Sequence, residues 1–231
     1  MTPDAGRFAF YDLDGTLVAS NVVTQYAYYV RRLPSRWRGW ARFARLLASV
    51  PLWLALDAVS RRAFNVVFYR EYRGLKKEWL EREAAGLFEA VFRPAMHDGA
   101  TGLVARDRAA GFRTVLVTGS LDFALPPLTR HFGFDHVIAN SLVFVNGVAT
   151  GKLAPPLLAG REKVEAIRRL CRQYNVDAAQ SKAYSDSLSD LPMLEAVGCP
   201  AAVNPDTRLR RIAEQRGWPI LNLRSNRNDR A

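Results

Sequence analysis

The fold is decided by the stretch Phe8-Ala9-Phe10-Tyr11-Asp12-Leu13-Asp14-Gly15-Thr16. Its apolar run, 8–11, stops at two acidic residues and a glycine, which is the pattern of a buried strand that ends in a polar loop. Asp12 and Asp14 are two positions apart, and side chains at that spacing point to the same side of an extended chain. Gly15 lets the backbone turn away after them. The stretch therefore predicts two carboxylates held together just beyond a strand.

Two further apolar runs end in the same way. Residues 114–117 stop at Thr118-Gly119-Ser120, and residues 182–184 stop at Ser185-Asp186. Ser120 is also placed where it could act as the N-cap of a following helix. Ligands of open α/β sheets bind beyond the carboxyl ends of the strands, so these segments are expected to converge on one crevice.

Helices are expected to separate the strands. The apolar periodicity predicts helices at 99–110, 161–174 and 191–196, and further strands at 137–139 and 201–203. Asn146-Gly147, between two short apolar runs, predicts a hairpin. Strands that alternate with helices indicate the α/β class, in the form of a three-layer, Rossmann-like parallel sheet covered on both faces.

Residues 21–94 have a different character. Aromatic and apolar residues alternate there with arginine at helical spacing, and the strand pattern is lost. This predicts three or four helices, broken near Pro34, Pro51 and Gly74. We therefore expect two domains: a catalytic core made of 1–20 and 95–231, and an inserted α-helical cap made of 21–94.

The charge of the chain is concentrated in this same segment. The net charge is +11, and residues 31–73 contain ten arginines and no lysine against Asp57 and Glu71. Such a concentration indicates an anionic partner, which could be a membrane surface, a nucleic acid or a phosphorylated substrate.

The acidic residues suggest what the crevice would bind. Asp186 and Asp190 join Asp12 and Asp14 at the strand ends. Carboxylates this close repel one another unless a cation lies between them, and hard oxygen ligands suit Mg²⁺. The Lys163 ammonium, the Thr118 hydroxyl and main-chain N–H groups, including that of Gly119, would supply donors to a phosphate. This is the combination that phosphoryl transfer requires.

Four segments together resemble the haloacid dehalogenase (HAD) superfamily, in its phosphoserine-phosphatase-like branch, subfamily IB. They are Asp12-Leu13-Asp14-Gly15-Thr16-Leu17, Val117-Thr118-Gly119-Ser120, Gly160-Arg161-Glu162-Lys163-Val164 and Tyr184-Ser185-Asp186-Ser187-Leu188-Ser189-Asp190. They occur in the family's order and at plausible separations, over about 8–19 and 98–210. The resemblance implies an HAD-like core with a cap inserted after the first strand.

The resemblance also implies roles. Asp12 would be the nucleophile that forms an aspartyl-phosphate, and Asp14 would be the general acid and base. Thr118, Gly119 and Lys163 would hold the phosphoryl oxygens. Mg²⁺ would be bound by Asp12, Asp186 and the main-chain carbonyl of Asp14, with Asp190 close to these ligands. The expected activity is Mg²⁺-dependent hydrolysis of phosphomonoesters.

The sequence differs from the phosphoserine-phosphatase-like branch at two places that bear on the identity of the substrate. Asn21 stands nine positions after Asp12, where the phosphoserine enzymes usually carry a substrate-binding glutamate, and Thr118-Gly119-Ser120 replaces their Ser-Gly-Gly. The substrate is therefore left open between a small soluble phosphate and a lipid phosphate. The alternative function is a membrane- or nucleic-acid-binding module on a HAD scaffold with little catalytic activity.

The uncharged run 46–56 bears on whether the protein acts on or binds lipid. It has eleven residues, arginines on both sides, and Trp37, Trp40 and Trp53 in or near it. It is too short to span a bilayer, which takes about 20 residues. It either faces lipid, as peripheral contact with an anionic membrane, or packs inside the protein; a nucleic acid partner is disfavoured.

Because 1–7 lacks an apolar leader, we expect a cytoplasmic protein or one peripheral to the inner face of the membrane. The oligomeric state is left open.

Overall fold

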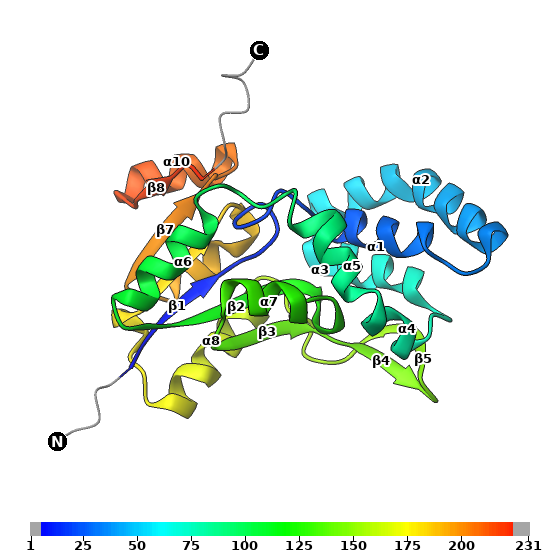
Figure 1. The fold of residues 1–231 in the computed structure, drawn as a ribbon. Helices are drawn as coiled ribbons and strands as arrows, with labels where there is room; N and C mark the ends of the chain where they lie inside the picture. Colours follow the sequence, from blue (N-terminus) through cyan, green and yellow to red (C-terminus); the bar gives the residue numbers. More distant parts are fainter. Residues whose placement is uncertain (1–5, 224–231) are drawn as a thin grey trace, which may run out of the picture.

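The computed structural model describes residues 6–223. The prediction that no leader is present therefore falls largely on 1–5, outside the described residues. The core is a six-stranded parallel sheet in the order β3-β2-β1-β6-β7-β8 (Figure 1). Its strands are β1 (Arg7–Tyr11), β2 (Phe112–Leu121), β3 (His136–Asn140), β6 (Lys182–Ser185), β7 (Cys199–Val203) and β8 (Ile220–Leu221).

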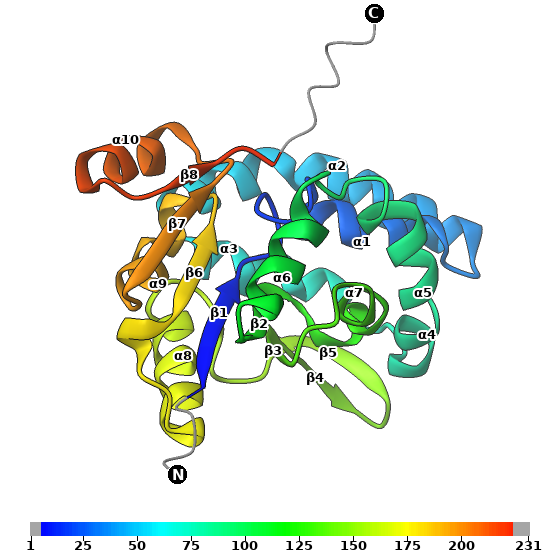
Figure 2. The same ribbon diagram turned by 60° about the vertical axis from the view of Figure 1, so that its left-hand side comes forward.

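Side chains of β1 alternate between the two faces of this sheet. Phe8 and Phe10 belong to the apolar cluster that includes α8 (Arg161–Tyr174), α9 (Leu191–Glu195) and α10 (Thr207–Arg216). Ala9 and Tyr11 belong to the cluster that includes α6 (Ala100–Ala109) and α7 (Pro126–Phe132). Figure 2 shows α6 and α7 on one side of the sheet. The predicted three-layer α/β core is confirmed, and its helices lie close to the predicted positions.

The central strand is flanked on both sides by the strands that carry the other motifs. Tyr11 is in register with Leu116 of β2 and with Tyr184 of β6, so the segments after these positions emerge at the same edge. β2 continues through Thr118-Gly119-Ser120 to Leu121, with a register shift against β3 after Val117. The strand therefore does not stop at this motif, and Ser120 is not a helix N-cap.

The segment between β1 and α6 is helical, as predicted, and lies to one side of the sheet (Figure 1). Its elements are α1 (Val22–Arg31), α2 (Arg36–Val59), α3 (Arg61–Phe68), η1 (Tyr69–Tyr72), α4 (Lys77–Arg82), α5 (Ala84–Leu87) and η2 (Phe88–Phe92). The predicted break at Pro51 is wrong, because α2 runs through it. An interior proline costs a helix about 3 kcal/mol. Leu46 and Trp53, on either side of Pro51, are both buried, and their packing offsets this cost.

A hairpin reaches from the core to these helices. β4 (Leu142–Val145) and β5 (Val148–Leu153) are antiparallel, and Asn146 and Gly147 between them have φ of 49° and 73°, as the predicted turn requires. Gly74 N–H donates to Ala149 O, and Lys77 N–H donates to Gly147 O, both at 2.8 Å. The division into 21–94 and the remainder stays our proposal, and by its contacts the hairpin belongs with the cap.

Over the described residues, no helix has both the length and the apolar character needed to cross a bilayer.

Candidate active site

Lys163 lies at the centre of a buried ion-pair network. Its Nζ is 2.7 Å from Asp12 Oδ1 and 2.8 Å from Asp190 Oδ2, and all three side chains are buried. Ser185 Oγ donates to the same Asp190 oxygen at 3.0 Å. The loop after β1, the first turn of α8 and the segment after β6 are thereby joined through one ammonium group.

The turn after Asp14 fits closely around Asp186. Gly15 has φ +89°, and a Cβ built on it would lie 2.1 Å from Asp186 Oδ2, so this position accepts only glycine. Thr16 Oγ1 donates to Asp186 Oδ1 at 2.9 Å. A ring nitrogen of His97, Nε2, lies 3.2 Å from Gly15 O. The backbone of the turn and the Asp186 carboxylate therefore form a tight oxygen-lined cradle.

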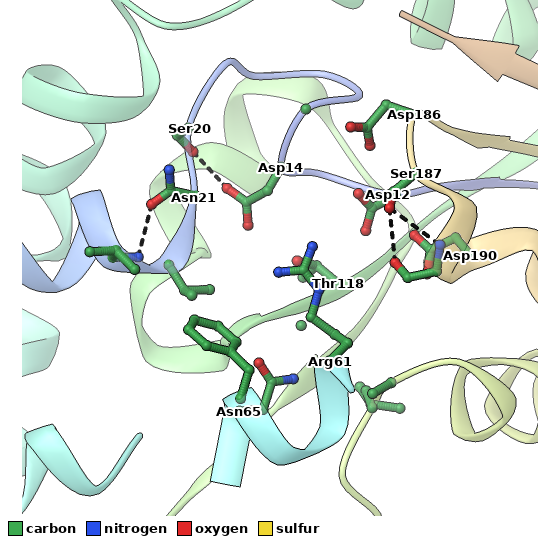
Figure 3. Close-up of a pocket in the computed structure, with 18 of the residues that line it drawn as sticks. Asp12, Asp14, Ser20, Asn21, Arg61, Asn65, Thr118, Asp186, Ser187 and Asp190 are labelled. Atoms are coloured by element: carbon green, nitrogen blue, oxygen red, sulfur yellow. Dashed lines mark hydrogen bonds between the residues drawn. The ribbon is translucent and has the colours of Figure 1, made fainter. Parts of the chain in front are cut away.

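The Asp14 carboxylate is held by three polar side chains. Ser20 Oγ donates to Oδ1 at 2.7 Å, which Figure 3 shows, and Ser120 Oγ donates to Oδ2 at 2.8 Å. Gln25 Nε2 donates to Oδ1 at 3.1 Å and also to Ser120 Oγ at 3.0 Å. Because Gln25 belongs to α1, the cap takes part in fixing the orientation of this acid.

Burial shifts the pKa values of these groups strongly. Desolvation, followed by repulsion from Asp190 and Asp186, raises the pKa of Asp12 against the opposing effect of Lys163. Burial alone would lower the pKa of Lys163, but Asp12 and Asp190 together hold it above its usual value. Burial and the Asp190 charge raise the pKa of Asp186 to about 6. One buried lysine thus faces three carboxylates, and a further cation would relieve the remaining repulsion.

The second motif is fixed by its own hydrogen bonds. Thr118 Oγ1 accepts from the main-chain N–H of Ser120 at 3.0 Å, and its side chain is buried. Gly119 O accepts from Tyr69 OH at 2.6 Å and from Asn140 Nδ2 at 2.8 Å. Tyr69 comes from the cap and Asn140 from β3, so three parts of the chain define the position of this glycine.

All seven residues predicted for the site line one cavity of about 600 Å³. From the core these are Asp12, Asp14, Thr118, Gly119, Lys163, Asp186 and Asp190. The cap closes the cavity with Asn21, Val22, Val23, Thr24, Val50, Trp53, Leu54, Arg61, Phe64 and Asn65. In Figure 3, Arg61 and Asn65 reach from α3 toward Asp12, Asp14 and Thr118. The structure thus brings the predicted residues together, while their roles stay predictions.

Several residues of the site were missed from the sequence. Ser20 and Gln25, which hold Asp14, lie just before and within the first cap helix, and Tyr69 binds Gly119 from the start of η1. Ser120 was considered, but as a helix cap. The alternation of Thr118 and Ser120 along a strand was the signal that both could lie beside the acidic loop.

No three Asp, Glu, His or Cys side chains of the described part of the chain converge into a ready-made metal cage. The Asp12 and Asp190 carboxylates instead contact Lys163, and the Asp186 carboxylate lies against Gly15 and Thr16.

The sequence matches the model of the haloacid dehalogenase-like hydrolases over residues 9–195. The chain belongs to this family. The match covers the motif-bearing strands and the cap between them, so the family assignment rests on the same residues as the site.

Relatives of this HAD hydrolase extend the match over nearly the whole chain. An "inhibition of morphological differentiation protein" of Streptomyces azureus is 33% identical over 93% of this chain and 78% of its own length. A "probable phosphatase" of Mycobacterium tuberculosis is 30% identical over 96% of this chain and 77% of its own.

Solved structures share the fold of this chain. A Bordetella pertussis protein of unknown function has a TM-score of 0.80 and 27% identity, over 95% of this chain and 99% of that one. A substrate-bound phosphoserine phosphatase has a TM-score of 0.72 over 98% of this chain and 97% of that one; at 16% identity it shows the shared fold alone. The predicted family, fold class and phosphatase type of enzyme are confirmed.

Proposed function

We propose that this HAD hydrolase cleaves phosphomonoesters in a Mg²⁺-dependent reaction, by transferring the phosphoryl group to Asp12. The observation that carries the proposal is the pairing of Lys163 with Asp12 Oδ1, beside an Asp14 that is fixed at the same cavity. The other carboxylate oxygen, Asp12 Oδ2, is 3.5 Å from Thr16 Oγ1, beyond an ordinary hydroxyl hydrogen bond. It is therefore the oxygen that we assign as the nucleophile.

The two steps then use groups of this chain. Asp12 Oδ2 forms a bond to phosphorus, the phosphorus–oxygen bond to the leaving group breaks, and Asp14 gives its proton to the departing alkoxide. In the second step a water attacks the phosphorus and gives its proton to Asp14, and the bond from phosphorus to Asp12 breaks, which releases inorganic phosphate. Lys163 neutralises charge on the phosphoryl oxygens, and the Thr118 hydroxyl donates a hydrogen bond to them.

We assign Asp12, Asp186 and the main-chain carbonyl of Asp14 as the protein groups that would hold Mg²⁺. The fit rests on the cradle at Gly15, where a side chain would occupy the space beside Asp186 Oδ2. It also rests on the donors, since Mg²⁺ takes one or two carboxylates and keeps waters and substrate phosphate oxygens. When bound, the ion would neutralise charge on the transferring phosphoryl group.

The cap side of the cavity indicates the class of leaving group. Asn21 caps α1, accepting from the N–H groups of Val23 and Thr24 at 3.0 Å, so its side chain is committed to the helix. The cap lining is otherwise mainly apolar, with Arg61 as its cation, and none of the cap residues that line the described cavity is acidic. An ammonium group such as that of phosphoserine lacks a partner there. We propose a monoester whose leaving group has an apolar part and no ammonium group.

One experiment tests the proposed function directly. Asp12→Asn should abolish Mg²⁺-dependent turnover of an aryl phosphate, since an amide is a poor nucleophile, and should show no phosphoryl adduct by intact mass after rapid acid quenching. Asp177→Asn is the matched control, because Asp177 is exposed outside the cavity and caps the short helix η4 (Ala178–Gln180) through Oδ1 alone, a role that asparagine fills equally well. Turnover above about 1% of wild type in Asp12→Asn would refute the nucleophile assignment.

A further inference from the structure

The longest helix of the cap, α2, exposes apolar side chains. Ten large apolar residues are exposed over the described part of the chain, and six of them lie on α2. We call these six the α2 outer face: Trp37, Trp40, Leu47, Leu52, Leu54 and Val59. Trp37 is 79% exposed and Trp40 is 68% exposed, which is unusual for the largest apolar side chain. Figure 1 shows α2 along the outer edge of the cap, away from the sheet.

The polarity of this helix is reversed relative to an ordinary surface helix. Within 44–55 the exposed residues are all apolar except Arg45, while Leu46 and Trp53 on the opposite side are buried. A surface helix of a globular protein normally turns a polar stripe to water. A contiguous exposed apolar patch with a polar rim instead marks an interaction surface.

Exposed arginines lie near the tryptophan-rich end of this face, and two of them, Arg31 and Arg36, line a surface hollow together with Trp40. Arg31 and Arg32, at the end of α1, and Arg36 and Arg38, beside Trp37, are all exposed. The two arginines nearer the middle of α2, Arg42 and Arg45, have structural roles.

Arg42 and Arg45 hold the cap together. Arg42 donates to Glu71 O at 2.5 Å and to Arg73 O at 2.7 Å, and Arg45 binds the Glu71 carboxylate. Substituting either of them would disturb the packing of α2 on η1. The arginines that remain for a partner on α2 itself are Arg36 and Arg38.

We propose that the α2 outer face docks onto an anionic lipid bilayer. Tryptophans favour the boundary between headgroups and acyl chains, where their rings are apolar and their N–H groups are hydrated. Arginines beside them are attracted to anionic headgroups. A second copy of this chain fits less well, because residues 31–73 carry ten arginines against two acidic residues and would meet the same excess.

Docking in this way would bring the active-site cavity close to the lipid. Val50, Trp53 and Leu54 of α2 line the cavity, and Leu54 is also 67% exposed on the outer face. The wall of the cavity therefore continues onto the surface that we assign to the bilayer. The docking proposal itself does not depend on the chemistry proposed for Asp12.

The test is sedimentation of the full chain with phosphatidylcholine vesicles, with and without phosphatidylglycerol, at low and high salt. We expect binding to the anionic vesicles at low salt and release by salt. Arg36→Gln with Arg38→Gln should weaken binding about 30-fold, from about 1 kcal/mol per arginine. Trp37→Ser with Trp40→Ser should weaken it at least about tenfold, from the loss of two buried rings.

The matched control substitutes two arginines of α10, which lies on the other side of the molecule from α2 (Figure 1). Arg208→Gln with Arg211→Gln removes the same charge from exposed positions of α10, and should leave vesicle binding within about twofold. Circular dichroism and thermal denaturation establish that every variant is folded. Absence of binding at low salt, or binding that the α10 pair weakens as much as the α2 pair does, would overturn the proposal. So would a dimer in analytical ultracentrifugation that Trp37→Ser with Trp40→Ser dissociates, because the face would then bind a second copy.

Discussion

Gln25 Nε2 donates to Asp14 Oδ1 at 3.1 Å, which joins a residue of the first cap helix to the acidic loop of the core. Gln25 is 3% exposed and also binds Ser120 Oγ, so it bridges the cap, the loop after β1 and β2. The position of the proposed general acid therefore depends on the position of the cap.

Gln25→Leu should slow the phosphorylation step by about 10- to 150-fold on alkyl phosphates, because a lost hydrogen bond to a charged group costs about 1.5–3 kcal/mol. An activated aryl phosphate has a good leaving group and should be affected much less. Single-turnover rates on the two substrates measure this, with thermal denaturation as the check on folding. Equal losses on both substrates would show that Gln25 does not act through Asp14.

Gly15→Ala should destabilise the protein and weaken its response to Mg²⁺, since the new Cβ would lie 2.1 Å from Asp186 Oδ2. Gly147→Ala is the matched control: Gly147 has φ +73° but no atom within 4 Å of its Cβ position. The control isolates the cost of the backbone conformation, about 1 kcal/mol. Urea denaturation and Mg²⁺ titration of activity compare the two variants. The crowded cradle would be contradicted if both variants lost the same stability and kept the wild-type Mg²⁺ response.

Asp186 should make the metal-free protein less stable as the pH rises from about 4 to 6. Burial raises its pKa in the folded state from 3.8 to about 6. Between these values the folded state holds a proton that the unfolded state has lost, so stability falls with rising pH, and the full penalty is present above about 6.

Asp186→Asn should remove this contribution. Relative to wild type, the variant should gain on the order of 2 kcal/mol between pH 4 and pH 7 in chelator, and the gain should shrink when Mg²⁺ is added. Urea denaturation at the two pH values measures the difference. A stability difference between variant and wild type that stays constant with pH would contradict the assignment.

Lys163→Met should cost about 3 kcal/mol of stability at neutral pH, because Asp12 and Asp190 would lose the cation between them in a buried site. Lys77→Met is the control, since Lys77 pairs with Glu81 at 3.7 Å but the two side chains are 53% and 49% exposed, so water can replace the ammonium group. We expect about 1 kcal/mol there. Equal costs from urea denaturation would argue that the Lys163 network is not a buried charge cluster.

The correct predictions concern features that follow from a single strand or turn and need no knowledge of tertiary contacts. Asp12, Asp14, Asp186 and Asp190 follow strands that end at one edge, and Thr118 lies within β2 at the same edge. Parallel strands bring such positions together without knowledge of any other contact. For the same reason the predicted layers of the core were correct. The hairpin at Asn146-Gly147 was also predictable, because its turn has a local requirement for positive φ.

The contacts between cap and core were not predictable in this way. Gln25 and Asp14 are 11 residues apart, and Tyr69 and Gly119 are 50 apart, with no local pattern to mark them as partners. The helix through Pro51 was missed because the rule for proline is local, whereas the packing of Leu46 and Trp53 is tertiary. β8 was missed because two residues carry too little periodicity.

The hairpin of β4 and β5 constrains the mechanics of the protein. Its main-chain hydrogen bonds to Gly74, Leu75 and Lys77 add a non-covalent attachment to the two places where the chain passes between cap and core. If the cap swings to admit substrate, the hairpin either travels with it, flexing the chain on both sides of 142–153, or these hydrogen bonds must break. The axis of this rotation is then set by four segments that cross between cap and core, at the two ends of 21–94 and the two ends of 142–153. Substitutions near Ser141 or Ala154 should therefore alter substrate entry, although these two residues do not line the cavity.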